Sequence, residues 1–464
     1  MKLIPIYYWN KTRKIFHEKS HNLTQKPWFQ GVLLIICVAV ALLLANLPLT
    51  RDLYQDILNT DIIIKLKSPD GAVNVSFPQN MNVGKFINDI LMVVFFFTVG
   101  LEIKREVAYG ELSSPKKAIL PIIAAFGGVV CPAIIYTIVN HSGPGASGWG
   151  IPTATDIAFA VCILSALGDK VPVAMKVFLT ALAIADDLIA ILVVALFYGG
   201  QLNLTLILIA LAMIGIALIL RKLGEKRMLP YLVIAFAIWV LFYYGGIHAT
   251  MSGVVMAFII PNKARYDKEG VYSRLKDSWA NFNQYDNIES GMGFPNGPQR
   301  HYLRELKRTV NGSMNMSYTL ERALSPWVNF LIMPLFALAN AGVRLDPSAL
   351  SSASNVAIGI MLGLMIGKPL GITLLSWLSV KLKIGEKPKG TSWPMFFAVA
   401  CLGGIGFTMS IFVDTLSFGD QAPELMENMR ATGKIAVLLG SLCSAIIGSA
   451  FVCIVNAIQK RRNS

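Results

Sequence analysis

The sequence predicts an all-α polytopic membrane protein with twelve transmembrane helices, inverted repeats, two interrupted helices and a short extracytoplasmic β-hairpin. The first observation is composition, because 55% of the 464 residues are hydrophobic and only 15% are charged, against roughly 25% charged residues in soluble domains. The second is the spacing of long apolar runs, and the third is the placement of basic residues between them. The composition excludes disordered, collagen-like and disulfide-stabilised secreted proteins.

The predicted spans follow from apolar runs of about 20 residues, the length that crosses a bilayer. Long runs occupy 28–47, 86–103, 118–139, 174–198, 203–220, 229–244, 327–343, 356–379, 394–416 and 431–457, and shorter ones occupy 152–167 and 246–260. Most of the 41 Lys and Arg residues fall in the N-terminal tail and in every second connection. By the positive-inside rule, this distribution places both termini in the cytoplasm. The net charge of +14 is spread over these connections, so it does not indicate nucleic-acid binding.

The chain divides into a cytoplasmic N-terminal tail over 1–27, a twelve-span domain over 28–457 and a cytoplasmic C-terminal tail over 458–464. No signal-peptide cleavage pattern precedes the first long apolar run. We therefore expect the N-terminal tail to be retained.

Two connections inside the twelve-span domain are long. The periplasmic connection over 49–85 contains two β-prone runs around a Pro-Asp-Gly turn, from Ile62 to Phe77, and these runs predict the β-hairpin. The cytoplasmic loop over 262–325 is polar, and its segment 301–310 predicts a basic amphipathic helix.

Three acids and one base stand out inside the predicted spans. They are Asp156, Asp186, Asp187 and Lys368. Placing such a residue in a span costs at least about 2.5–3.5 kcal/mol, so each needs a partner, a water-filled cavity or a function. Asp186 and Asp187 point about 100° apart on a helix, so they face different partners. We expect one of them to pair with Lys368 and the other to offer oxygen ligands to a small hard cation beside Asp156.

Two spans carry signals of helix interruption. One surrounds Asp156, which follows Gly150 and Pro152, and the other contains three glycines in GGIGFTMS over 403–410. A glycine costs about 1 kcal/mol relative to alanine in a helix, so the three glycines predict extended backbone. The triplet of spans around the first interruption runs opposite to the triplet around the second, which predicts an inverted repeat. Asp156 and Lys368 can offset the partial charges of the half-helix ends.

A series of motifs makes the chain resemble the NhaA-type bacterial sodium/proton antiporters. The motifs are FFFTVGLEIKRE (95–106), IPTATDIAFA (151–160), FLTALAIADDLIAI (178–191), GIHATMSGV (246–254), PLFALANAGV (334–343), IGKPLGI (366–372) and GGIGFTMSIF (403–412). The resemblance extends over about 28–457 and implies broken helices around an ion site near the membrane midplane. It also implies electrogenic exchange of Na+ or Li+ for protons by a homodimer in the bacterial inner membrane. This exchange would contribute to sodium and pH homeostasis.

The resemblance assigns roles to residues of the matching motifs. It implies that Asp187 is the primary ligand of Na+, with Asp156 beside it. It implies that Asp186 is the partner of Lys368, and that cation and protons compete for these carboxylates. The implied supporting residues of the broken helices are Thr155, Thr408 and Gly404.

The resemblance further implies a pH-responsive region at the cytoplasmic entrance. Its members are Glu102, Arg105, Glu106, His248 and Glu321. Glu102 and Arg105 are three residues apart and can also pair at a helix end. The family has a shorter connection before the ninth span, with histidines just after an acid, whereas here Glu321 is followed by Arg322 and Ser325. This departure bears on the pH set-point and not on the exchange.

Three alternatives belong to other classes. A sodium-coupled symporter of an organic anion is the runner-up, but it needs a roomy polar pocket beyond the ion site. An intramembrane aspartyl protease needs a GxGD pattern, which is absent around Asp156, Asp186 and Asp187, and a passive channel needs repeated polar pore-lining residues. We therefore expect a secondary active transporter and not an enzyme, with no cofactor and with Na+, Li+, H+ and the lipid bilayer as partners.

Overall fold

The computed structural model describes residues 27–62, 64–67, 74–77, 81–200, 202–225, 227–262, 264, 266–284, 297–344, 354–418 and 422–463. Within these residues, nine helices are long and apolar enough to cross a membrane, or up to eleven if each of two bent helix pairs counts as one span. Helix α11 (Thr250–Ile259) is a shorter apolar helix. The protein is therefore a multi-pass helical membrane protein, as the hydropathy predicts.

The chain forms two compact units, which are described separately. The first comprises 1–95, 106–200 and 327–464, and the second comprises 96–105 and 201–326. Helix α5 (Met92–Tyr109) contributes residues to both.

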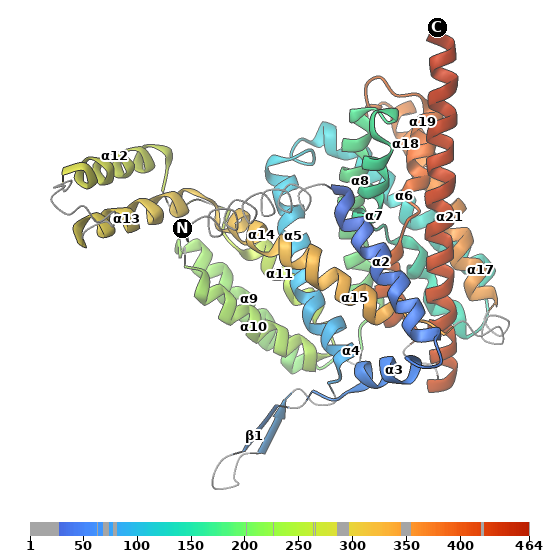
Figure 1. Ribbon diagram of the computed structural model, residues 1–464, viewed down its shortest axis with the longest axis horizontal. Helices are drawn as coiled ribbons and strands as arrows, with labels where there is room; N and C mark the ends of the chain where they lie inside the picture. The colour runs from blue at the N-terminus through green and yellow to red at the C-terminus, as the bar shows by residue number, and fades with distance from the viewer. Residues whose placement is uncertain are drawn as a thin grey trace, which may run out of the picture. The chain divides into compact units, whose positions relative to one another are not determined.

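The first unit contains most of the long helices (Figure 1). Its continuous helical elements are α2 (Pro27–Asn46), α3 (Arg51–Asn59), α4 (Val83–Lys85), the π-helical turn η1 (Phe86–Leu91), α6 (Pro115–Val139), the 3-10 turn η3 (Gly168–Lys170), α8 (Val173–Phe197), the π-helical turn η4 (Val328–Ile332), α15 (Met333–Asn340), α17 (Ser354–Leu362), the π-helical turn η5 (Gly363–Gly367), α18 (Lys368–Lys381) and α21 (Pro423–Asn463). Its bent pairs are the 3-10 helix η2 (Pro144–Thr153) with α7 (Ile157–Ala166), and α19 (Trp393–Leu402) with α20 (Phe407–Leu416).

Close backbone packing positions helix α18. A Cβ added to Gly127 on α6 would overlap the carbonyl of Gly371 on α18, and one added to Gly371 would overlap the carbonyl of Gly127. Two side chains at these positions would force the helices apart. The glycine pair therefore holds α18 against α6, with Lys368 one turn before the contact.

The second unit contains α9 (Leu204–Lys222), α10 (Met228–Gly245), α11, α12 (Lys268–Gln284), α13 (Gly297–Ser313) and α14 (Met316–Trp327). Helices α9 and α10 pack side by side, as do α12 and α13 (Figure 1). Lys104 on α5 donates from Nζ to the carbonyls of Ala257 and Phe258, each at 3.0 Å, and so supplies positive charge at the end of α11.

The structure extends one predicted span. The sequence predicts a loop up to 325 and a span over 327–343, but a continuous apolar helix runs from Met316 to Asn340. Hydropathy missed its first turns because Ser317 and Glu321 are polar, although both are buried. Helix α13 includes the predicted amphipathic segment.

Two strands occur in the predicted periplasmic connection. Strand β1 (Ile64–Lys67) pairs antiparallel with β2 (Asn74–Phe77), and Ile64 lies opposite Phe77. The connecting residues 68–73 are outside the described residues. The hairpin as a whole therefore stays a prediction.

Candidate functional site

The two bent helix pairs of the first unit meet at their breaks. The bend is 43° between η2 and α7 and 51° between α19 and α20. Asp156 N donates to Ile405 O at 2.7 Å, and Thr155 Oγ1 donates to Gly403 O at 2.9 Å. The polar groups exposed at one break thus find hydrogen-bond partners in the other break. The lipid interior of a membrane offers no such partners.

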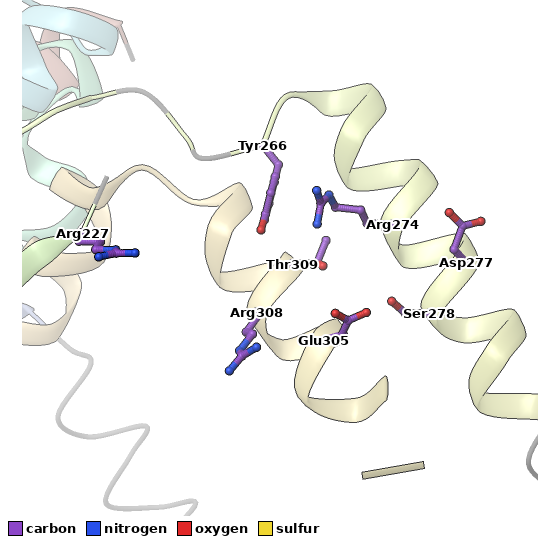
Figure 2. Close-up of a pocket in the computed structure, with 8 residues that line it drawn as sticks. All are labelled: Arg227, Tyr266, Arg274, Asp277, Ser278, Glu305, Arg308 and Thr309. Carbon is purple, nitrogen blue, oxygen red and sulfur yellow. The ribbon is translucent and has the colours of Figure 1, made fainter. Parts of the chain in front are cut away.

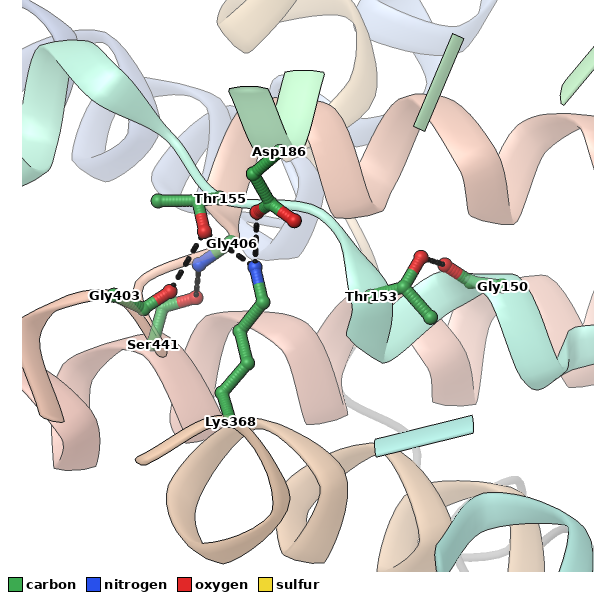
Figure 3. Close-up of polar contacts among 8 residues, drawn as sticks. All are labelled: Gly150, Thr153, Thr155, Asp186, Lys368, Gly403, Gly406 and Ser441. Atoms are coloured by element: carbon green, nitrogen blue, oxygen red, sulfur yellow. Dashed lines mark hydrogen bonds and ion pairs between the residues drawn. The ribbon is translucent and has the colours of Figure 1, made fainter. Parts of the chain in front are cut away.

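The first break is extended. Ala154 (φ −86°, ψ 151°) and Asp156 (φ −97°, ψ 104°) both have extended backbone. Before the break, Thr153 Oγ1 donates to Gly150 O at 2.7 Å (Figure 3). The interruption that the sequence predicts around Asp156 is confirmed.

The second break is a tight turn, and the prediction of extended backbone was wrong at Gly403 and Gly406. Gly403 (φ −63°, ψ −20°) and Gly406 (φ −101°, ψ −4°) lie in the right-handed helical region. The glycines serve close approach instead. A Cβ on Gly404 would overlap the carbonyl of Leu364, and one on Gly406 would lie 2.8 Å from Ala154 O. The absence of side chains here lets the second break pack against the first.

The carboxylate of Asp156 serves the N-termini of two half-helices. Its Oδ1 accepts from Phe159 N, in the first turn of α7, at 3.2 Å. Its Oδ2 accepts from Thr408 N, in the first turn of α20, at 3.0 Å, and also from Thr408 Oγ1. Asp156 is only 1% exposed. One buried negative charge therefore lies at two partially positive helix ends, which stabilises both.

Lys368 joins Asp186 to the first break. Its Nζ lies 2.6 Å from Asp186 Oδ2 and also donates to Thr155 Oγ1 (Figure 3). The side chains of Lys368 and Asp186 are 0% and 3% exposed. The expected ion pair is thus present, and its lysine additionally contacts the broken helix that carries Asp156.

Asp187 is the next residue on α8 and is 2% exposed. It acts electrostatically on Lys368, although its side chain leaves the helix about 100° from that of Asp186. The first unit therefore brings together a net negative group of three buried acids and one lysine. Such a group can balance a bound cation or bound protons.

Three of the predicted entrance residues cluster within the second unit. Arg105 forms an ion pair with Glu321 on α14, and its Nη2 lies 3.9 Å from Glu102 Oε1. Glu321 is 7% exposed, whereas the side chains of Arg105 and Glu102 are 39% and 37% exposed. The cluster thus links the buried carboxylate of Glu321 to the half-exposed side chains of Arg105 and Glu102.

The other two entrance residues have local contacts. Glu106, in the first unit, accepts from Glu111 N at 3.2 Å. His248, in the second unit, precedes α11, and its carbonyl accepts from Met251 N at 3.0 Å.

The candidate set omits further ionisable residues of the predicted spans, among them Asp414 and Lys434. Asp414 on α20 is 0% exposed, and Lys434 on α21 acts electrostatically on it. Both lie inside predicted spans, 394–416 and 431–457. The criterion applied to the other four, an ionisable residue within an apolar run, also selects these two.

A polar cavity of about 540 Å³ lies beside α12 and α13 in the second unit (Figure 2). Its charged lining residues are Arg227, Arg274, Arg308, Asp277 and Glu305. The arginines outnumber the acids, so the lining attracts anions and repels Na+. This cavity is therefore not a candidate cation site.

The chain is similar to known proteins along most of its length. The model of the family described as Na+/H+ antiporter 1 matches residues 21–452. A protein named Na(+)/H(+) antiporter NhaA from Helicobacter pylori strain G27 is 39% identical over 446 residues, which cover 96% of this chain and 98% of the relative. Proteins of the same name from Salmonella paratyphi B and Salmonella choleraesuis are each 39% identical over 420 residues, 90% of this chain and 93% of the relative. The chain therefore belongs to the Na+/H+ antiporter 1 family.

Proposed function

We propose that this chain is an electrogenic antiporter that exports Na+ or Li+ in exchange for protons and contributes to sodium and pH homeostasis. Membership of the family supports cation/proton exchange. The observation that carries the proposal is the buried Asp186–Lys368 pair beside Asp187, where two broken helices meet. Ionisable residues at membrane depth mark ion pathways and proton relays.

Competition for the same carboxylates supplies the coupling. Deprotonated Asp187 and Asp156 take the cation from the cytoplasm. A rearrangement of the broken helices then exposes these carboxylates to the outside, where protons displace the cation. The carboxylates return protonated. Neighbouring acids separate their pKa values, so a pair of them releases and takes up protons in distinct steps.

Exchange of two protons for one cation moves one net charge in each cycle. The membrane potential then contributes about 2.3 kcal/mol per charge per 100 mV. At acidic pH the carboxylates stay protonated, so we expect Na+ exchange to fall. Exchange that remains undiminished well below neutral pH contradicts this competition.

We further propose twelve spans in a bacterial inner membrane, with both termini cytoplasmic. The triplet α6, η2/α7 and α8 then runs opposite to the triplet α17/α18, α19/α20 and α21. The proposed regions are the tails 1–27 and 458–464, the twelve-span domain 28–457, its periplasmic connection 49–85 and its cytoplasmic loop 262–325. Lys and Arg placement supports this topology. A reporter enzyme that is active only in the cytoplasm tests this topology. We expect it to be active when it is fused to either terminus.

The entrance residues are proposed to adjust exchange to cytoplasmic pH. They are Glu102, Arg105, Glu106, His248 and Glu321. The buried end of the Arg105–Glu321 pair supports this role, since protonation of Glu321 would remove the acid nearer to Arg105 and shift its pairing toward Glu102, which lies 3.9 Å away. Glu321→Gln is expected to move the pH midpoint of exchange while leaving the maximal rate in place.

A homodimer is proposed through the predicted hairpin. Within the described residues, the sheet consists of β1 and β2 alone, so each strand has an outer edge that can pair with a second copy. Deletion of 62–77 is expected to yield monomers by light scattering of the purified protein. Dimers that persist without these residues contradict this interface.

The decisive experiment is Na+-induced dissipation of a pH gradient in vesicles that contain the purified protein. Wild type is compared with Asp187→Asn and with Asp52→Asn, a matched control that neutralises an acid whose side chain is 75% exposed. We expect Na+-dependent proton movement in wild type and in the control, and none in Asp187→Asn.

Two other outcomes contradict the proposal. Full activity of Asp187→Asn would show that this carboxylate is not the exchange site. No proton movement at any pH, with Na+ binding retained, would favour the sodium-coupled symporter of an organic anion instead.

A further inference from the structure

Asp414 is a buried carboxylate without a role in the mechanism above. It lies in the last turn of α20 and is 0% exposed. Neither of its carboxylate oxygens has a hydrogen-bond partner among the residues that the structure describes. An ionised carboxylate in an apolar interior without hydrogen bonds is strongly disfavoured. Such a residue at membrane depth is a functional-site candidate.

Two cations on α21 offset its charge. Lys434 and Arg430 both act electrostatically on Asp414, and Arg430 Nη2 donates to Ser417 O at 3.2 Å, just after α20. A Cβ added to Gly433 would overlap Asp414 Oδ1. The carboxylate therefore lies directly against the α21 backbone, in the field of both cations.

The other elements that pack against α20 add few titratable groups. Tyr136 on α6 and Tyr198 after α8 lie within electrostatic reach of Asp414. Helices η2 and α15 also contact α20 but have no ionisable side chain. Among the described parts of these elements, the titratable groups facing Asp414 are thus Lys434, Arg430 and the two tyrosines.

A row of positions on one face of α20 leads from Asp414 to the break. Gly406, Ser410 and Asp414 are spaced four residues apart, so they lie on the same face. Ser410 is 0% exposed, its Oγ has no hydrogen-bond partner in the described structure, and it lies against Gly406. Thr408, which bonds Asp156, lies about 9 Å from Asp414 along the helix axis.

A surface cavity includes Gly145, the hydrogen-bond partner of Tyr136, in its lining. It has a volume of about 170 Å³, and its lining includes exposed Ser142 and Asn428 and buried Gly145. Tyr136 OH donates to Gly145 O at 2.7 Å. Tyr136 therefore contacts the cavity lining and also lies within reach of Asp414.

We propose that Asp414 is a further proton-binding site, which takes protons from this cavity and passes them along the Ser410 face of α20 toward Asp156. The carboxylate takes a proton from hydronium, which leaves water and a neutral acid, and regains its charge when it releases that proton toward the break. The inference rests on the proposed antiport function and topology, in which this end of α20 faces outside.

A proton fits this site better than an alkali cation does. Lys434 and Arg430 repel a cation, and a hard cation needs several oxygen ligands at once. A proton needs only the carboxylate. Asp414 thus differs from Asp187, which is one of a group of three buried acids and one lysine.

The test uses everted membrane vesicles, whose lumen is the extracytoplasmic side and supplies the protons. Na+ is added outside at fixed outer pH, and lumen pH is set in steps. In Asp414→Asn, we expect the lumen pH for half-maximal exchange to move about one unit toward acid, a tenfold change in proton concentration. The Na+ concentration for half-maximal rate should stay as in wild type. Asp414→Glu keeps a carboxyl group and should therefore have a pH profile close to that of wild type. The control Asp52→Asn should have the wild-type profile.

Ser410→Ala provides a second test, because it leaves the charged groups of Asp414, Lys434 and Arg430 in place. We expect a smaller acid shift of the same profile. If Asp414→Asn does not accumulate as folded protein, an unshifted Ser410→Ala profile overturns the inference. If Asp414→Asn is folded, an unshifted profile in that variant overturns it. Absence of Na+-dependent proton movement in wild type contradicts the proposed function itself, so the two failures are distinguishable.

Discussion

The two broken helices differ in what they bring to their meeting point. The break before α7 is extended and brings a carboxylate on Asp156 and a hydroxyl on Thr155. The break before α20 turns tightly through glycines that approach other backbone, and it brings the N–H and hydroxyl of Thr408. The first break thus supplies a negatively charged carboxylate. The second break supplies hydrogen-bond donors and glycines that allow close backbone packing.

This difference shows how two half-helix ends share one acid. Both helix N-termini are partially positive, and Asp156 accepts hydrogen bonds from both. A second acid at the α20 break would place two like charges together, which is unfavourable in a buried site. Lys368 reaches the first break through Thr155. The charged chemistry is therefore concentrated on one of two otherwise similar interruptions.

Lys368→Met tests the charge at the first break and has the largest expected effect. Removing one partner of a buried ion pair costs about 3–5 kcal/mol, because Asp186 is left buried and charged. We expect a lower melting temperature of the purified protein and loss of exchange. The double variant Lys368→Met/Asp186→Leu should regain much of the stability and remain inactive. A Lys368→Met variant as stable as wild type would show that the first break does not need the charge of Lys368.

Asp156→Asn tests whether one charge serves both helix ends. Each helix end contributes up to about 2 kcal/mol in a favourable buried geometry, so we expect a loss of roughly 2–4 kcal/mol together with weaker Na+ binding. Thermal unfolding and Na+ titration measure these effects. The exposed control Asp52→Asn should unfold as wild type does, and an equally small change in Asp156→Asn would contradict the shared charge.

Gly404→Ala tests the close fit of the second break. The added Cβ would overlap the carbonyl of Leu364, and overpacking of this kind costs about 1–3 kcal/mol. Gly215→Ala is the matched control, because no heavy atom lies within 4 Å of its added Cβ. We expect thermal unfolding to shift down in the first variant only. A fully tolerated Gly404→Ala would mean that the glycines are not needed for close approach.

Thr408→Val has the smallest expected effect. It removes the hydroxyl donor to Asp156 but keeps the backbone N–H that bonds the same oxygen. A hydrogen bond to a charged group contributes about 1.5–3 kcal/mol, and we expect the lower end of that range. Melting temperature checks this value, with Thr408→Ser as the variant that retains the hydroxyl. A loss of stability as large as that of Asp156→Asn would show that Thr408 contributes more than a hydrogen-bond donor.

Much of the membrane architecture could be predicted because hydropathy and charge are local signals. The long spans, the interruption at Asp156 and the partnership of Asp186 with Lys368 agree with the structure. The start of the helix at Met316 could not be predicted, because its buried polar residues lower the local hydropathy. Asp414 met the same sequence criterion as Asp156 and was nevertheless missed.

Hydropathy alone predicts that the chain crosses a membrane many times and identifies ionisable residues within its apolar runs, because both are properties of neighbouring residues. Helix packing, in contrast, brings Asp156 to the N-terminus of a helix that begins at residue 407, places Gly404 against Leu364 and makes the α20 break a turn. These contacts join residues far apart in the chain. Periodicity and composition describe residues a few positions apart, whereas packing of whole helices selects which distant groups meet.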